Sequence, residues 1–157
     1  MDRAACELFA ELFAYPRGGT AEQALQCLAR VQQPELGTFA AWAQRAPQGE
    51  IEEAFCAAFD LSPQSAPYVG EQLCEEPAQR GLFLAHLNGI YAAEGFAPRE
   101  ELPDHFSEVL RFAAVTSDEG ARQELLRDGL LPAAARVASS LSGPYRALVE
   151  ALRGALS

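Results

Sequence analysis

The segment Ala5-Cys6-Glu7-Leu8-Phe9-Ala10-Glu11-Leu12-Phe13 sets the fold class. Its apolar side chains stand three, four, seven and eight residues after Ala5, which is the spacing of one face of an α-helix. Pro16 ends this helix, because proline lacks the backbone donor that a helix interior needs. Similar spacing recurs along most of the chain, and no alternating run is long enough for a strand. The sequence therefore predicts an all-α protein.

Caps, prolines and glycines mark the expected helix ends. Thr20 with Gln23, and Thr116 with Glu119, have the spacing of capping boxes. Ser62, directly before Pro63, is a predicted N-cap, and Gly95, followed by Phe96, is a predicted C-cap. In the second helix, Thr20 to Val31, we expect Leu25, Leu28 and Val31 to face inward. The helices expected after it are Pro34 to about Pro47, about Glu50 to Phe59, about Pro77 to Glu94, about Pro103 to Val115, Thr116 to about Gly129, Leu131 to Leu141 and Pro144 to Leu156. A chain of 157 residues fits one domain, so we expect a single-domain helical bundle over residues 1–157.

The charge balance bears on the class of partner. Acidic residues number 22 and basic residues 12, all of them Arg, for a net charge of −10. Such a field repels phosphate backbones, which argues against nucleic-acid binding. It favours a basic partner, although acidic faces also simply keep a protein soluble.

Cysteine usage and hydropathy bear on the compartment. The four scattered cysteines have no C-x-x-C pair, and only two histidines could join them in a metal site. We therefore expect buried free thiols in a reducing compartment and no metal. Asp2, Glu7 and Glu11 interrupt the apolar pattern of the N-terminal segment, which argues against a signal peptide, and no apolar run approaches the length that spans a bilayer. These features predict a cytoplasmic protein without direct membrane insertion.

Catalytic motifs are missing from the chain. It has no nucleophile elbow, no glycine-rich phosphate loop, no zinc-protease motif and no calcium loop. His86 falls at the edge of an apolar helical face, where a packed histidine is more common than a catalyst. The adjacent acid pairs point in different directions on a helix and make poor general acid–base pairs. We expect no enzymatic activity and no cofactor.

One helical flank differs from a simple core stripe. On the helix expected from Pro103, a step of about 100° per residue places His105 and Phe112 on the same flank, with Glu108 beside them. This flank could line a groove for a partner helix. A wide apolar face with Phe112 packed under a neighbouring helix explains the same pattern.

Two groups of motifs resemble a known family. The first is Phe59-Asp60-Leu61-Ser62-Pro63, followed by Tyr68 and Arg80-Gly81; the second is Tyr91-x-x-x-Gly95-Phe96, Glu101-Leu102-Pro103-Asp104-His105 and Leu110-x-Phe112. In this order they resemble the nitrate reductase delta subunit, or NarJ-type, chaperones within the TorD-like redox-enzyme maturation proteins. The resemblance extends from about Phe55 to the C-terminus.

The resemblance implies an all-helical, cofactor-free chaperone for a molybdenum enzyme. Such proteins bind the N-terminal segment of the catalytic subunit as a helix in a groove and keep the enzyme competent for cofactor insertion. The implied partner is the nitrate reductase alpha subunit; the alternatives are another member of the dimethyl sulfoxide reductase superfamily with a twin-arginine leader, or a helical adaptor that is no chaperone. The candidate peptide-binding residues are Asp60, Leu61, Ser62, Tyr68, Glu101, Pro103, Asp104, His105, Glu108, Leu110 and Phe112.

The motif match and the helical placement suggest roles for some of these residues. Carboxylates at Asp104, Glu101 and Glu108 would pair with peptide arginines. Phe112 and Leu110 would form an apolar floor. Asp104 could equally act as a first-turn helix stabiliser, and Pro103 could set the helix start.

Overall fold

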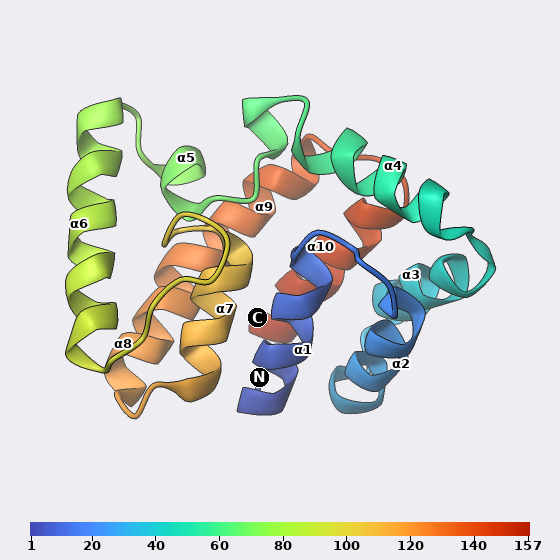
Figure 1. The fold of residues 1–157 in the computed structure, drawn as a ribbon, viewed down its shortest axis with the longest axis horizontal. Helices are drawn as coiled ribbons and strands as arrows, with labels where there is room; N and C mark the ends of the chain where they lie inside the picture. The colour runs from blue at the N-terminus through green and yellow to red at the C-terminus, as the bar shows by residue number, and fades with distance from the viewer.

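Ten α-helices and two short helices of other types make up the regular structure of residues 1–157 in the computed structural model (Figure 1). The α-helices are α1 (Arg3–Phe13), α2 (Thr20–Val31), α3 (Pro34–Arg45), α4 (Gln48–Phe59), α5 (Val69–Leu73), α6 (Pro77–Ala93), α7 (Phe106–Val115), α8 (Glu119–Glu124), α9 (Leu131–Ser139) and α10 (Pro144–Leu156). A 3₁₀ turn, η1 (Pro63–Ser65), precedes α5, and a π-helix, η2 (Leu125–Leu130), joins α8 to α9. No strand forms, so the all-α prediction is confirmed.

The core lies around α1, which packs between α7 and α2 (Figure 1). Phe9 and Phe13 of α1 are fully buried, and the Phe13 ring meets the Phe106 ring at a centroid distance of 5.7 Å. On the other side, α10 packs against α3 and α9 and brings Tyr145 into an aromatic cluster with Phe39 and Phe59. One contiguous hydrophobic cluster results, with members from α1 to α10.

The two predicted capping boxes are wrong. Thr20 is buried in the first turn of α2, whose N-cap is Gly19 with a left-handed φ of 75° and no side-chain cap. At the second site Asp118 caps α8 by accepting from the Ala121 N–H at 3.0 Å. Thr116 instead donates its hydroxyl proton to Glu94. The partner of Thr116 lies 22 residues away, which the local spacing does not reveal.

The inward face of α2 also differs from the expectation. Ala24 and Cys27 are the buried positions, whereas Leu25 is 41% exposed and Leu28 is only partly buried. The helix face therefore lies about one residue away from the predicted stripe.

Helix α7 begins three residues later than predicted. His105 is its N-cap, with an imidazole that accepts from the Ser107 N–H at 3.1 Å. Pro103 and Asp104 lie before the helix, because this segment pairs with the chain that enters α5. The Val69 N–H donates to the Asp104 carbonyl and the Phe106 N–H to the Pro67 carbonyl, each at 2.8 Å. Asp104 is therefore not a first-turn residue.

Helix α6 stands at the edge of the molecule, at the left of Figure 1. Only Leu87 and Tyr91 of its seventeen residues are buried. Its C-terminal end is closed as expected by Gly95 at φ 68°, with the Phe96 ring 4.9 Å from the Tyr91 ring. None of the helices, α6 included, combines the length and apolar character needed to cross a bilayer.

Candidate functional site

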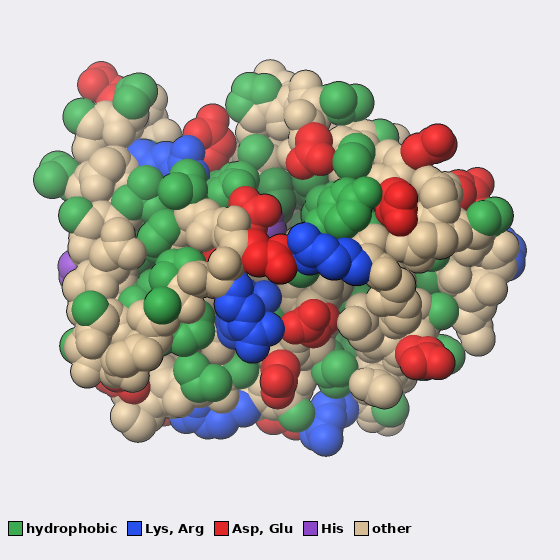
Figure 2. Space-filling view, viewed as in Figure 1, with side chains coloured by type: hydrophobic (Ala, Val, Ile, Leu, Met, Phe, Trp, Pro, Cys, Tyr) green, Lys and Arg blue, Asp and Glu red, His purple; other side chains and the backbone are tan.

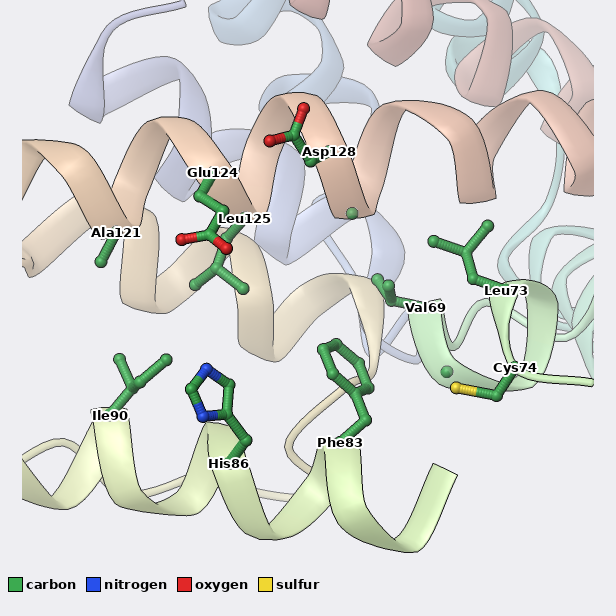
Figure 3. A pocket seen from close by; sticks show the side chains of 12 residues that line it. Val69, Leu73, Cys74, Phe83, His86, Ile90, Ala121, Glu124, Leu125 and Asp128 are labelled. Atoms are coloured by element: carbon green, nitrogen blue, oxygen red, sulfur yellow. The ribbon is translucent and has the colours of Figure 1, made fainter. Parts of the chain in front are cut away.

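A groove separates α6 from the continuous helix made of α8 and η2, and α5 closes one end of it (Figure 3). We call it the α6 groove. It encloses about 220 Å³. Figure 3 shows the side chains of α6 pointing across it toward Glu124 and Leu125. Its lining residues are Val69, Gly70, Leu73, Cys74, Phe83, His86, Ile90, Ala121, Glu124, Leu125, Asp128 and Gly129.

The groove is apolar inside and acidic at its rim. Phe83 and Ile90, seven residues apart on one face of α6, face Leu125 across the cavity. Glu124 and Asp128 are exposed, and no arginine lines the cavity. On the face seen in Figure 2, hydrophobic side chains also gather beside α6. Such a surface suits a ligand with one apolar side and a positively charged edge.

Asp104 joins α5, at the closed end of the groove, to α6, which forms one of its walls. Its carboxylate is completely buried and accepts from the Gly70 N–H of α5 at 2.9 Å. The Arg80 guanidinium of α6 donates to both carboxylate oxygens, at 3.0 and 3.1 Å. Hydrogen bonding to Asp104 raises the pKa of Arg80. The two-pronged pair holds α5 and α6 in a defined relation.

Gly70 is a glycine for steric reasons. A Cβ atom there would lie 2.6 Å from an Asp104 carboxylate oxygen and 2.9 Å from the Arg80 Cγ. No larger residue can let α5 approach the ion pair this closely.

Tyr68 extends this network toward the surface. Its hydroxyl donates to Glu101 at 2.7 Å, and the Arg80 guanidinium lies 5.1 Å from the centre of its ring. The ring also meets His105 edge-on at 4.8 Å. Burial, followed by the hydrogen bond to Glu101, raises the pKa of Tyr68. The structure thus brings together four of the candidate residues, Tyr68, Glu101, Asp104 and His105, with Arg80, which belongs to the first motif but was not among the candidates.

His105 is a structural imidazole. It is 4% exposed, and burial, with a smaller contribution from the Arg111 charge, lowers its pKa to about 3. Because Nδ1 accepts from the Ser107 N–H, the neutral ring carries its proton on Nε2.

His105 should make the protein sensitive to acid. In the unfolded chain a histidine gains its proton below pH about 6.5, whereas His105 stays neutral in the folded protein down to about 3. The contribution of His105 to stability is therefore complete above pH about 6.5 and is lost as the pH falls toward about 3. Asparagine at position 105 keeps an acceptor for the cap but does not titrate. Between about pH 5.5 and 4.5, the free energy of unfolding of His105→Asn should therefore fall by about 1.4 kcal/mol less per pH unit than that of the wild type. Urea unfolding across this range measures it.

The control for this prediction is His86→Asn, which removes an exposed imidazole. Equal acid slopes for wild type and His105→Asn would contradict the assignment of a neutral His105.

Three other predicted residues, Glu108, Leu110 and Phe112, lie in the interior. All are completely buried, so the expectation that they line an open groove is wrong for this structure. Glu108 pairs with Arg111 at 2.7 Å and accepts the Arg99 N–H at 3.0 Å, which anchors the loop before α7. Neighbouring helices cover this flank of α7, as the wide-core alternative proposed.

The last group of predicted residues, Asp60, Leu61 and Ser62, forms a corner away from the α6 groove. Ser62 caps η1 as expected by accepting from the Gln64 N–H at 3.3 Å. Leu61 is 78% exposed. The buried Gln72 of α5 donates to three carbonyl groups of this turn, which links the corner to the groove wall.

The groove-lining residues were missed in the sequence. Glu124, Leu125 and Gly129 lie in the helix predicted from Thr116 to about Gly129, for which no site was predicted, although their spacing along one helical face was a usable signal. Pro103 is the remaining predicted residue. Its carbonyl accepts a hydrogen bond from the buried Tyr91 hydroxyl at 2.7 Å.

Comparison with known proteins gives two findings. The family model described as "Nitrate reductase delta subunit" matches residues 22–147. A protein of Bacillus subtilis (strain 168), named "Probable nitrate reductase molybdenum cofactor assembly chaperone NarJ", is 34% identical over 94 residues. The matched region covers 59% of this chain and spans about half (50%) of that relative.

Proposed function

Because the chain belongs to the nitrate reductase delta subunit family, we propose that it is a cytoplasmic assembly chaperone for a molybdenum enzyme, with nitrate reductase as its client. It binds the N-terminal segment of the catalytic subunit and keeps the enzyme competent for insertion of the molybdenum cofactor before membrane attachment. The name of the Bacillus subtilis relative supports the client class.

The observation that carries the proposed binding mode is the α6 groove, with its apolar interior and acidic rim. A helix is about 10–12 Å wide with its side chains, so a volume of about 220 Å³ admits only a few apolar side chains from one face of a peptide helix. Basic side chains on the flank of that helix would then lie near Glu124 and Asp128. The net charge of −10 steers such a peptide toward the protein.

The motif residues hold the helices that form this groove in position. Asp104 and Arg80 hold α5 against α6, and Tyr68 with Glu101 covers the pair. These residues are therefore positioning residues in the proposal, and Glu124, Asp128 and Leu125 are the peptide contacts.

A binding experiment tests the charged rim. The double variant Glu124→Gln/Asp128→Asn should bind a fluorescent peptide of the client N-terminus about tenfold more weakly, since each rim charge contributes up to about 1 kcal/mol. Its affinity should also depend less on salt concentration. Fluorescence anisotropy at low and moderate ionic strength measures both.

The matched control is Glu35→Gln/Glu53→Gln, which removes the same charge from exposed sites outside the groove. Equal affinity and equal salt dependence for the rim variant and this control would reject the groove. A wild-type protein that fails to bind the peptide, and captures no molybdenum enzyme from host cells grown anaerobically with nitrate, would reject the chaperone function.

A further inference from the structure

The helix that forms one wall of the α6 groove contains a π-helical turn. Within η2 the Leu131 N–H bonds to the Leu126 carbonyl, five residues back instead of four. Pro132 follows this turn in the first turn of α9 and disfavours a regular α-helix here. In a regular α-helix it would leave the Asp128 carbonyl without a donor, and its ring would clash with that carbonyl. π-Helical turns are rare and are found frequently at functional sites.

The helices on both sides of this turn are held in place. Ala133 and Ala134 of α9 are completely buried. On the other side, Arg122 of α8 donates to the Ala113 carbonyl at 3.0 Å and to the Met1 carbonyl at 2.6 Å. One extra residue in a turn rotates the flanking segments by about 100° relative to one another. Since neither flank is free to rotate, η2 must accommodate the extra residue.

The π turn changes which residue faces α5. In a regular helix Asp128 would lie on the same face as Glu124 and Leu125, four and three residues earlier. Figure 3 shows the Asp128 side chain on the side of the helix away from α6, while Glu124 and Leu125 point toward α6. Gly129 takes the wall position, where a Cβ atom would lie 3.5 Å from the Val69 Cγ1.

We infer that Pro132 and its π turn act as a specificity element for the client peptide. They place Gly129, which has no side chain, in the groove wall against Val69, so this part of the groove presents no charge and accepts an apolar side chain of the client. They turn the Asp128 carboxylate out of the apolar wall. The inference rests on the proposed function and adds the side-chain pattern that the groove selects.

Two single-residue deletions in a Pro132→Ala background test this assignment. Deleting either Gly129 or Asp128 removes the extra residue, so that α8 and α9 join as a regular helix with their buried faces unchanged. Deletion of Gly129 moves the Asp128 carboxylate into the apolar wall, whereas deletion of Asp128 leaves Gly129 there. Both proteins should fold, with melting temperatures at or above that of Pro132→Ala.

Peptide affinity separates the two deletions. The Gly129 deletion should bind at least about tenfold more weakly than the Asp128 deletion, because an apolar side chain would then face an unpaired carboxylate. The Asp128 deletion should match Asp128→Asn. A client peptide with its bulky apolar residues replaced by alanine should lose this difference.

The outcomes that overturn the inference are distinct from those that overturn the proposed function. Equal affinities of the two deletions, beside normal binding by the wild type, would reject the specificity element alone. Unfolding of both deletions while Pro132→Ala stays folded would reject the idea that η2 holds one removable residue. Absence of binding by the wild type would reject both proposals.

Discussion

Replacement of Asp104 with alanine should lower the free energy of unfolding by about 3 kcal/mol or more, since breaking a buried ion pair typically costs about 3–5 kcal/mol. The carboxylate is completely buried, and its removal leaves the Gly70 N–H without an acceptor. Arg80 keeps its exposed pairing with Glu71 and is itself 22% exposed, which places the loss toward the lower end of that range.

Urea unfolding followed by circular dichroism measures this loss. Asp104→Asn keeps an oxygen that accepts from the Gly70 N–H but loses the charge. Its free energy of unfolding should therefore lie between that of Asp104→Ala and that of the wild type. The control is Glu100→Ala, which breaks an exposed pair with Arg17 and should cost less than about 1 kcal/mol. An alanine variant as stable as this control would show that Asp104 does not hold α5 and α6 together.

Replacement of Phe112 with alanine should destabilise the protein by about 3–5 kcal/mol, the usual cost of removing a buried aromatic side chain. Phe112 is completely buried and lies between two other rings, with centroid distances of 4.7 Å to Tyr91 and 5.4 Å to Phe96. Tyr91 and Phe96 anchor the C-terminal end of α6, so the cavity left behind would also loosen that helix.

The matched control for Phe112 is Leu82→Ala, on the outer face of α6, where the side chain is 75% exposed. It should change stability by no more than about 0.5 kcal/mol. If Phe112→Ala kept its stability and lost only peptide affinity, Phe112 would be a peptide contact, as first expected from the sequence, and the packing described above would be wrong.

The candidate site could be predicted only in part from the sequence. The motifs pointed to Tyr68, Asp104 and His105, and these residues do meet. Their roles were not predictable, because the partners of Asp104 lie 34 residues away at Gly70 and 24 residues away at Arg80. A carboxylate in a sequence motif looks the same whether it faces solvent or an internal arginine.

Local spacing was enough to predict the helices, because a helix forms from hydrogen bonds and apolar faces within a few residues of one another. The all-α class and most helix ends follow from this, as do the turn at Gly95 and the cap at Ser62. Which face of each helix is covered depends on its neighbours in space. Tertiary packing therefore decided that Phe112 is interior, that α7 starts at Phe106, and that the open groove lies beside Leu125, where contacts between distant segments leave apolar side chains uncovered.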